Sequence, residues 1–430
     1  MSTAISASST QLDIPQYCEQ LADQARAAGR ALGATSGAKR AAALDHVAQR
    51  LLDEAAAIQA ANAKDLATGE QAGLSKAMLD RLRLDDKRIA AMAQSVRQIA
   101  QQPDPVGQVI EGYVRPNGLR LQKLRVPIGV VLIIFESRPN VTSDAAALCI
   151  KSGNAVILRG GKEAVHSNAA IAHCVQGGLE DTGLDPATVQ LVQTTDRSAV
   201  GALLKMVGKI DLAIPRGGES LIKAVVEQAH IPVIKHYTGN CQVYVDQAAD
   251  DAMALAVCVN AKTQRPGVCN AAETLLFHQQ AAQRGVLHRV CEALAQQGVE
   301  IRGDEATRKL FPNAKPASED DWAAEYLDLI VAVKVVDDVD EAINHINQYG
   351  SGHTDAILTQ DIAAADQFVQ RVDSANVFVN CSTRFSDGGE YGLGAEIGIS
   401  TDKLHARGPM GAADLTTYKW VAHGQGQIRT

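Results

Sequence analysis

Several features that mark particular classes of protein are missing from this sequence of 430 residues. No apolar run approaches the roughly 18–20 residues that a helix needs to cross a bilayer, so we predict no membrane-spanning segment. An excess of basic residues is also missing. The net charge of −8 and the pI of about 5.8 argue against binding to nucleic acid or to an anionic membrane. The N-terminus lacks the basic and apolar stretches of a secretory signal, and we interpret it as a short disordered lead.

Metal and disulfide motifs are missing as well, although the chain has 8 cysteines. None forms a CxxC pair or has the Cys/His spacing of a zinc site, so the sequence predicts no metal centre. Several cysteines lie in apolar segments such as "ALCIKSG" and "HRVCEAL", where a thiol packs as a small hydrophobic group. Reduced thiols are typical of a cytoplasmic enzyme. The composition, 46% apolar and 21% charged, predicts a globular protein with a sizeable core.

The order of helical and strand patterns predicts an α/β fold. Residues 15–102 are rich in alanine, and apolar positions recur every three or four residues, which indicates long amphipathic helices. From residue 126 onward, runs such as "VPIGVVLIIF" and "NAVILRGG" are typical of parallel strands buried on both faces. We therefore predict a Rossmann-type cofactor domain formed by residues 15–108 and 127–246.

Three further parts are expected. A second α/β unit, the catalytic domain, is predicted for residues 247–381, and the glycine-rich residues 382–411 would form a loop that crosses back over the site. Within residues 109–126, Asn117-Gly118 favours positive φ at both centres of a tight turn and predicts a projecting β-hairpin. Residues 412–430 contain a strand-like piece that could pair with this hairpin to form a small β arm.

Cys269, in "TQRPGVCNAAETLLFH", has the surroundings of a reactive thiol. Lys262 and Arg265 precede it closely, and the Pro266-Gly267 turn can direct backbone N–H groups toward an incoming oxygen. Cations and backbone donors lower the pKa of a thiol, and the thiolate is a strong nucleophile toward aldehydes and activated acyl groups. A structural thiol is the alternative, and the residues alone leave both interpretations open.

Two segments have the character of cofactor sites. "IPRGGESLIKAV" places Gly217, Gly218 and Glu219 where a strand turns into a helix, which suits a pyrophosphate or the polarised end of a cofactor. The GxGxxG spacing is missing, so an ordinary tight turn is an equal alternative. "AVILRGGKEAVHSN" places Arg159 and Lys162 at a strand end, where a 2′-phosphate would select NADPH over NADH. Here the alternative is a solvated basic loop.

Two other segments could bind substrate. In "FESRPNVTSDAAALC", Arg138 could clamp a carboxylate or phosphate, and Asn140 could donate to an oxyanion. "VNCSTRFSDGGEYG" offers three side chains in one loop as an anion-recognition set: Ser382, Thr383 and Arg384. The alternative is that these side chains cap helices and brace loops. We interpret His353, in "YGSGHTDAI", as a histidine that stabilises its loop.

These pieces, in this order, resemble the aldehyde dehydrogenase superfamily from about residue 15 onward. "RPGVCN" stands where that family has its nucleophilic cysteine, and "IPRGGESLI" takes the place of its glycine turn at the nicotinamide end. The resemblance implies that Cys269 is the nucleophile and that Asn140 or the backbone N–H of Cys269 holds the oxyanion. "EYLDLIVAV" resembles the family's glutamate-bearing segment, which makes Glu325 the counterpart of the carboxylate that binds the nicotinamide ribose.

Three departures from the family pattern narrow the resemblance. His236 stands where the superfamily has the glutamate that activates water for thioester hydrolysis. Glu136 takes the place of the oxyanion asparagine, and Lys162 lies near the position of the missing glutamate that binds the adenosine ribose. With "QRPGVCNAAETLL" and "NQYGSGHTDAI", this combination is similar to the members that reduce L-glutamyl 5-phosphate to L-glutamate 5-semialdehyde with NADPH, the second step of proline biosynthesis.

For such an oxidoreductase, the resemblance implies a cytoplasmic homo-oligomer, with glutamate 5-kinase as the partner to expect. We assign Arg265 and Lys262 to the phosphate or the thiolate, and Arg138, Ser382 and Arg384 to the substrate anions. Two alternatives remain. The first is a hydrolytic aldehyde dehydrogenase of the same fold, against which the missing glutamate counts. The second is a catalytically silent scaffold, to which an intact cysteine turn would be of no use.

Overall fold

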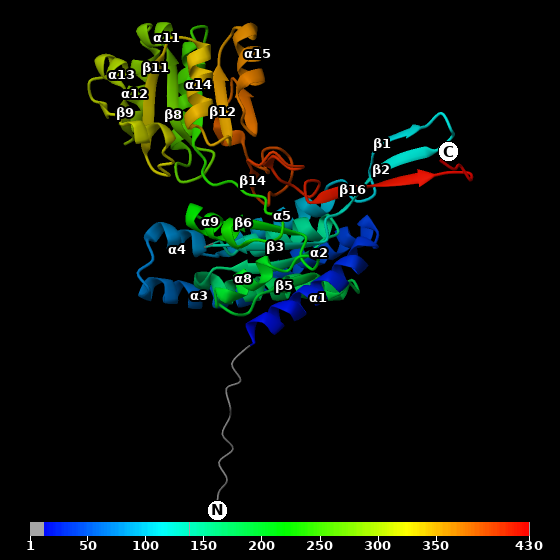
Figure 1. The fold of residues 1–430 in the computed structure, drawn as a ribbon. Coiled ribbons are helices and arrows are strands. Elements are labelled where there is room, and N and C mark those ends of the chain that lie inside the picture. The colour runs from blue at the N-terminus through cyan, green and yellow to red at the C-terminus, as the bar shows by residue number, and fades with distance from the viewer. Residues whose placement is uncertain (1–12, 137, 430) are drawn as a thin grey trace, which may run out of the picture. The chain divides into compact units, whose positions relative to one another are not determined.

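The computed structural model describes residues 13–136 and 138–429 (Figure 1). The predicted N-terminal lead lies, over residues 1–12, outside the described residues. The chain divides into two compact units. Unit 1 runs up to Ile234 and resumes at Ala412, and unit 2 takes Lys235–Gly411. Within the described ranges, no helix has the length and apolar character needed to cross a membrane.

Unit 1 starts with the amphipathic helices that the alanine-rich periodicity predicts. Their bounds are α1 (Ile14–Gly33), α2 (Gly37–Asp53), α3 (Ala55–Gln71), α4 (Lys76–Leu82) and α5 (Asp86–Gln101). The side chain of Asp13 accepts a hydrogen bond from the backbone N–H of Gln16, and that of Ser36 accepts one from Lys39. Each cap satisfies a backbone donor that the first turn of a helix cannot pair internally.

A parallel sheet in the order β5-β4-β3-β6 forms the centre of unit 1. Its strands are β3 (Val130–Phe135), β4 (Ala155–Gly160), β5 (Val189–Leu191) and β6 (Leu212–Arg216). Every residue of β3 is buried, as expected for a strand covered on both faces. This arrangement confirms the predicted Rossmann-type architecture.

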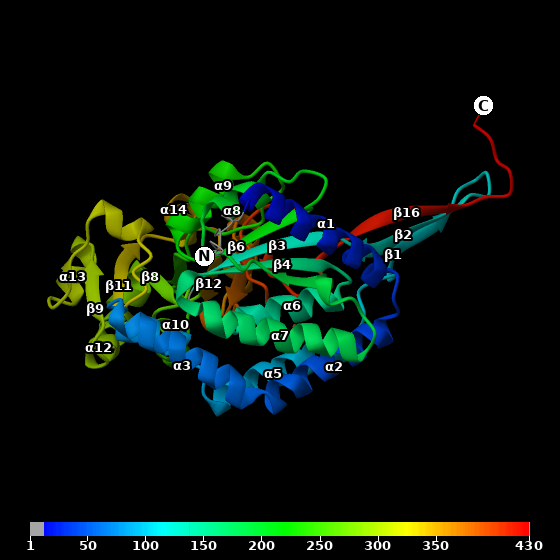
Figure 2. The ribbon, with the colours of Figure 1, turned by 90° about the horizontal axis from the view of Figure 1, so that it is seen from below.

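Helices cover both faces of this sheet. The helices that follow its strands are α6 (Val141–Lys151), α7 (Val165–Asp181), α8 (Ser198–Leu204) and α9 (Glu219–Gln228). Figure 2 shows α6 and α7 between the sheet and an outer layer of α2, α3 and α5, while α1, α8 and α9 lie on the opposite face. The core of unit 1 is therefore enclosed on both sides, which explains the near-continuous apolar runs in its strands.

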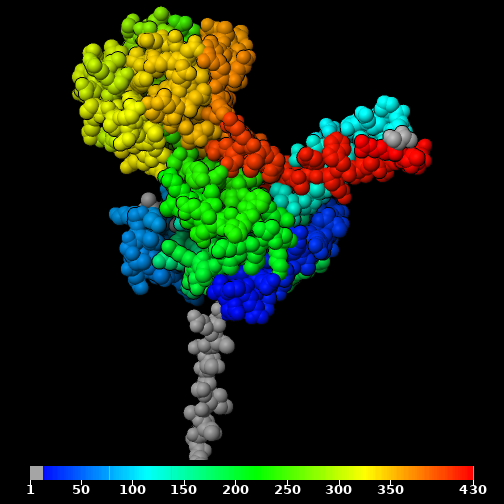
Figure 3. Space-filling model, in the orientation of Figure 1, coloured from blue at the N-terminus to red at the C-terminus, as the bar shows by residue number. Residues whose placement is uncertain are grey.

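A three-stranded antiparallel arm joins the two sequence segments of unit 1. Its order is β1-β2-β16, and the strands are β1 (Val109–Val114), β2 (Arg120–Pro127) and β16 (Thr416–His423). β16 pairs with β2 from Thr416, opposite Pro127, to His423, opposite Arg120. Figure 3 shows the arm extending away from the rest of unit 1. The predicted hairpin and its pairing with a C-terminal strand are thus confirmed.

The turn of the hairpin differs from the prediction. Gly118 has φ of +86°, but Asn117 is not among the described residues with positive φ. The ring of Pro116 fixes its own φ near −65°, and the N–H of Gly118 donates to the carbonyl of Arg115 (2.8 Å). The loop is therefore a type I turn followed by a glycine in the left-handed region. The proline outweighed the preference of the Asn-Gly pair.

Unit 2 is built on a parallel sheet in the order β10-β9-β11-β8-β7-β12-β13. Its strands are β7 (Cys241–Val245), β8 (Ala272–His278), β9 (Glu300–Gly303), β10 (Lys315–Pro316), β11 (Ile330–Val336), β12 (Thr354–Leu358) and β13 (Asn376–Val379). Its helices are α10 (Asp251–Thr263), α11 (Gln279–Gln283), α12 (Val286–Gln296), α13 (Glu305–Leu310), α14 (Val339–Tyr349) and α15 (Ile362–Arg371).

Alternate side chains of β8 enter separate cores of unit 2. Leu275 and Phe277 belong to the cluster that includes Cys258 of α10, and Leu276 belongs to the cluster that includes Phe368 of α15. Successive side chains of a strand point to opposite faces, so β8 is apolar throughout because helices cover both faces.

The predicted domain boundary after residue 246 is wrong in its position. β7 pairs with β8 on one side and with β12 on the other, both within unit 2. A buried apolar strand carries no local signal of the sheet to which it belongs, so "QVYVD" could not be assigned from its pattern. The boundary between the units lies instead between Ile234 and Lys235.

Residues 382–411 form an irregular segment of unit 2, as their glycine content predicts. The segment holds the short 3₁₀ turn η4 (Thr383–Phe385) and the two-residue strands β14 (Ile399–Ser400) and β15 (Gly408–Pro409), which pair with each other. Asp402 anchors it to the start of the unit, because its carboxylate accepts from Lys235 Nζ (2.7 Å) and from the Lys235 backbone N–H (2.9 Å).

Candidate active site

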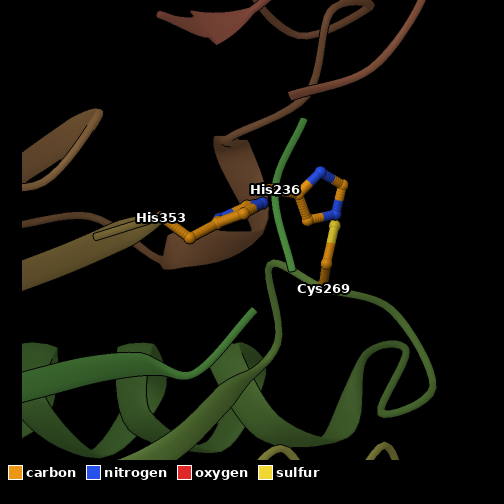
Figure 4. Close-up of side chains that lie close together, drawn as sticks. All are labelled: His236, Cys269 and His353. Atoms are coloured by element: carbon orange, nitrogen blue, oxygen red, sulfur yellow. The ribbon is translucent and has the colours of Figure 1, made fainter. Parts of the chain in front are cut away.

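Three neighbouring strands of unit 2, β8, β7 and β12, start at the same edge of the sheet, and the loop before each carries one member of a cluster. Cys269 precedes β8, His236 precedes β7, and His353 stands directly before β12. The Cys269 Sγ and one ring nitrogen of each histidine lie within 4.8 Å of one another. Figure 4 shows the three side chains pointing toward one another. Parallel pairing therefore assembles a thiol with two imidazoles.

The backbone of Cys269 is held closely by the neighbouring loop. A Cβ atom on Gly239 would lie 2.1 Å from the carbonyl oxygen of Cys269, so only glycine lets the two segments approach this far. The thiol of Cys241 donates to the same carbonyl (3.1 Å). Cys269 itself is half-buried, whereas all the other cysteines except Cys381 are buried. The backbone of Cys269 is thus fixed, and its side chain is partly accessible.

His353 is fully buried, and its protonation state can be derived from its neighbours. Its Nδ1 lies 2.9 Å from the Thr354 hydroxyl oxygen, and that hydroxyl donates to Ser386 Oγ (2.9 Å). With Thr354 as the donor to Ser386, its one hydrogen is used, so it accepts from His353 and the proton is assigned to Nδ1. Burial lowers the pKa of His353 to about 4. At neutral pH, Nε2 therefore carries a lone pair, and it has no hydrogen-bond partner among the described residues.

Two guanidinium groups lie near the thiol. Nε of Arg384, which is half-buried, donates to Gln264 Oε1 (2.8 Å). Its pKa is lowered first by burial and then by the charge of Arg265, while Cys269 acts in the opposite direction. The structure therefore brings together Cys269, Arg265 and Arg384, and the repulsion between the two cations would be relieved by a bound anion.

Lys262 is not placed to meet a substrate, which corrects the sequence prediction. Its side chain and that of Glu273 are both 0% exposed, and its Nζ donates to Glu273 Oε2 at 2.5 Å. Burial raises the pKa of Glu273, and the charge of Lys262 opposes this rise. The ammonium compensates a buried carboxylate inside unit 2, and so it stabilises the base of the cysteine loop.

Ser382 also has a structural position that differs from the predicted one. It is buried, and its hydroxyl accepts from the backbone N–H of Arg384 (3.3 Å), so it caps η4. Thr383 is buried as well. Glu325 is half-buried in unit 2, and its charge acts on both His353 and Cys241. Glu325 therefore lies near the cluster, and its role toward the ribose remains a prediction.

In unit 1, a hollow lies at the carboxyl ends of β4 and β5, where open α/β sheets bind nucleotides. It is lined by Gly160, Gly161, Val165, Asn168 and residues 191–195. The guanidinium of Arg159 donates to the carbonyls of Gly160 (2.9 Å) and Thr195 (3.1 Å), so it braces the rim of the hollow. Lys162, just beyond Gly161, is exposed. The hollow lies where open α/β sheets bind nucleotides, and the role of Lys162 toward a 2′-phosphate stays a prediction.

The glycine turn before α9 is partly occupied by a carboxylate of the protein itself. The N–H of Gly218 donates to Glu136 Oε2 (3.1 Å), and a Cβ on Gly217 would lie 2.4 Å from the same oxygen. Glu219 forms an ion pair with Lys223 one turn further on (2.8 Å). The anion at this turn is Glu136, the residue after β3, and the predicted role of Gly217, Gly218 and Glu219 toward a cofactor stays a prediction. This contact of Glu136 with the turn before α9 was not predicted from the sequence.

Asn140 and Arg138 lie at the start of α6 in unit 1. Asn140 Nδ2 donates to Asp144 Oδ2 (2.9 Å), and burial raises the pKa of Asp144 to about 6. Arg138 is half-buried. The amide of Asn140 thus orients a carboxyl group within its own helix. Its role toward an oxyanion, like that of Arg138 toward a substrate anion, stays a prediction.

The sequence interpretation missed the role of His353. It treated this histidine as a loop brace because a Gly-Ser turn surrounds it, and that local setting is found in the structure. The available signal was the position of "GSGH" directly before a buried strand, combined with the fact that parallel strands start at a common edge. Recognising it requires knowing that β12 and β8 lie on either side of β7.

Comparison with known proteins identifies the family of this chain. The model of the aldehyde dehydrogenase family matches residues 8–309 and 322–398. The chain belongs to this family.

Within it, the chain is 54% identical over 418 residues to the gamma-glutamyl phosphate reductase of Geotalea daltonii, covering 97% of this chain and 100% of the relative. The crystal structure of the gamma-glutamyl phosphate reductase from Thermotoga maritima has a TM-score of 0.93 and 45% identity, and the match covers 96% of this chain and 100% of that chain. The Saccharomyces cerevisiae gamma-glutamyl phosphate reductase has a TM-score of 0.54 and 32% identity, with 96% and 98% covered.

Lys262→Met tests whether this lysine is structural. The variant leaves the Glu273 carboxylate buried without its partner, so we expect the free energy of unfolding in urea to fall by about 3–5 kcal/mol. The double variant Lys262→Met/Glu273→Leu removes both charges and should recover most of this loss. Lys309→Met, which removes an exposed ion pair with Glu305, should leave the unfolding midpoint unchanged. A normal midpoint with a raised KM in Lys262→Met would instead indicate a substrate contact.

Proposed function

We propose that this enzyme reduces L-glutamyl 5-phosphate to L-glutamate 5-semialdehyde and phosphate with NADPH, as the names of its relatives suggest. The observation that carries the proposal is the cluster around Cys269. Within the described part of the chain, the group that closes on Sγ contains two imidazoles and no carboxylate. The side chain closest to the thiol from the β7 loop is thus an imidazole, where a hydrolytic enzyme needs a carboxylate base to activate water, so the site favours transfer of the acyl group to a hydride over hydrolysis.

The first step is attack of Cys269 Sγ on the γ-carbonyl carbon, which forms the C–S bond of a thioester and breaks the C–O bond to phosphate. The thiol proton passes to the imidazole of His236 and leaves with the phosphate. His353 is neutral and keeps the polar lining of the pocket uncharged. Reduction of the thioester needs a hydride, which is what bound NADPH would supply. Collapse of the resulting thiohemiacetal oxyanion breaks the C–S bond and releases the semialdehyde and the Cys269 thiolate, which a proton from solvent returns to the thiol.

The substrate brings two anions, and the site offers two cations to receive them. The charge of Arg265 lowers the pKa of Arg384 and that of Asp387 opposes this, so a phosphate or carboxylate beside the two guanidinium groups would gain charge-assisted interactions. We assign the departing phosphate or the α-carboxylate to this pair and keep Arg138 as a further substrate contact. Lys262 and Ser382 are left out of the substrate site because they are buried in structural roles.

NADPH is proposed as the cofactor on the basis of unit 1. The hollow at the ends of β4 and β5 would hold the adenosine, and Lys162 would bind its 2′-phosphate. Gly217, Gly218 and Glu219 would face the nicotinamide half once the Glu136 carboxylate moves from the Gly218 N–H. In unit 2, Glu325 would bind the nicotinamide ribose. The eight free cysteines suit a cytoplasmic location.

A homo-oligomer is proposed from the arm. Tyr113, Tyr418 and Trp420 are each 47–50% exposed on it, and its outer strands β1 and β16 leave backbone donors and acceptors available for another strand. A second copy of the chain would cover both features. Glutamate 5-kinase, which would make the acyl phosphate, is the second partner that we propose.

The reaction is tested in reverse with glutamate semialdehyde. We expect NADP reduction that requires inorganic phosphate, that is slower with NAD, and that is abolished in Cys269→Ser because the hydroxyl is a far weaker nucleophile. Cys381→Ser, which alters the other half-exposed thiol, serves as the control and should keep full activity. Oxidation at an equal rate without phosphate would contradict the proposal and favour a hydrolytic dehydrogenase.

His236→Glu should convert part of the reductase flux into hydrolysis. The new carboxylate would activate water beside the thioester, so phosphate release from L-glutamyl 5-phosphate would proceed without NADPH consumption. We expect the ratio of hydrolysis to reduction to rise by about a hundredfold, the lower end of what a positioned general base contributes. His236→Gln removes the imidazole without adding a base and is the matched control. Equal hydrolysis in both variants would refute the role assigned to this position.

Carboxylates introduced on the arm test whether the arm forms the interface between copies of the chain. Tyr418→Glu/Trp420→Glu should reduce the molar mass measured by light scattering after size-exclusion chromatography, because carboxylates resist burial in an interface. Ile362→Glu, which changes a side chain 78% exposed on α15, should leave the mass unchanged. A wild-type mass in the double variant would place the interface elsewhere.

A further inference from the structure

We infer that Cys269, His236 and His353 form a binding site for a soft divalent cation of the Zn²⁺ class, and that occupation reversibly inactivates the enzyme by capturing its nucleophile. The ligands are one thiolate and two imidazoles, which is a donor set that Zn²⁺ prefers. The sequence could not show this site, because its members come from three loops separated by 33 and 84 residues, from 236 to 269 and from 269 to 353.

The orientation of His353 is the observation that most strongly supports a metal site. Histidines that bind metals usually donate the other ring N–H to a fixed acceptor, which aims the lone pair at the ion. The proton on Nδ1 of His353 is held by Thr354, and Thr354 in turn accepts from Asn376 Nδ2 (3.3 Å) and donates to Ser386. Nε2 is fully buried and unpartnered among the described residues. A buried lone pair without a donor is costly, and a cation would satisfy it.

The distances require only a small adjustment. With Zn–S of about 2.3 Å and Zn–N of about 2.0–2.1 Å, tetrahedral ligands lie roughly 3.3–3.6 Å apart. The three ligand atoms now lie within 4.8 Å of one another, so they need to close by at most about 1.5 Å, shared among three side chains. His236 and Cys269 are half-buried on irregular segments and can rotate, while the buried His353 provides the fixed point.

Charge and proton balance permit the binding step. Cys269 loses its thiol proton to solvent as the S–Zn bond forms, and each imidazole binds through a nitrogen lone pair. Glu396 and Glu325 act on His353 in the direction that favours positive charge, while Arg384 is the opposing cation near the thiol. Three protein ligands leave a fourth position for water. The inhibitory effect rests on the proposed function, whereas the binding does not.

The test uses the full-length enzyme, freed of metal with a chelator and kept reduced with a phosphine. Zn²⁺ is titrated in competition with a chromogenic zinc indicator, and Co²⁺ is added separately as a spectroscopic probe. We expect one Zn²⁺ per chain and a sulfur-to-cobalt charge-transfer band. Cys269→Ser should abolish the band, and His236→Gln should weaken Zn²⁺ binding by more than about tenfold. Thr354→Val, which removes the support of His353, should weaken it by about 10–100-fold.

Two controls separate this site from general metal binding. Cys381→Ser changes the other half-exposed thiol, and His288→Gln changes an exposed histidine of α12; both should keep wild-type affinity. Absence of a one-per-chain site in the wild type, or unchanged binding in Cys269→Ser, overturns the inference. Because these titrations use no substrate, their result is independent of the reaction that the enzyme catalyses. Where binding is found, added Zn²⁺ should stop turnover, and a chelator should restore it.

Discussion

The placement of β7 between β8 and β12 is the constraint on which the site depends. Val243 of β7 lies opposite Leu275 of β8 on one side and opposite Ala356 of β12 on the other. A shift of one residue would turn every side chain of β7 to the other face of the sheet. It would also break buried polar contacts, since the N–H of Gln242 donates to Asp355 Oδ1 (2.8 Å). The starting points of the three strands are therefore fixed relative to one another.

Fixed starting points explain why Cys269 and the two histidines lie together at the amino edge of their sheet. Open parallel sheets usually bind ligands beyond the carboxyl ends of their strands, and the hollow in unit 1 follows that rule. In unit 2, the thiol and both imidazoles precede their strands, and Gly239 brings the His236 segment against the backbone of Cys269. Each group stands on a loop that leads directly into a buried strand, so the core strands fix the backbone positions from which the three side chains extend.

The sequence predicted those features that depend on local patterns. The amphipathic helices, the strands of the Rossmann-type sheet and the hairpin all follow from periodicity and turn residues, and the motifs identified the family. It could not predict which sheet β7 joins, because a buried strand looks the same in either. It also placed Lys262 at the substrate. A lysine near a cysteine in sequence gives no sign that Glu273, eleven residues along, lies against it within the core. The position of His353 beside Cys269 could be predicted only from the order of the strands, which the sequence does not show.

The same cluster also explains why an imidazole replaces a carboxylate near the thioester. A glutamate beside Cys269 would provide a permanent base for water. His353 is neutral because burial lowers its pKa to about 4, and its remaining lone pair is buried with few routes for solvent. In the proposed reaction, a pocket lined by imidazoles would protect the acyl group from hydrolysis, and the same nitrogen atoms and thiolate would be offered to any soft cation that enters. The selectivity proposed for the site and its proposed affinity for metal thus have one physical origin: a thiol and two imidazoles held together, with one imidazole nitrogen buried and unpartnered among the described residues.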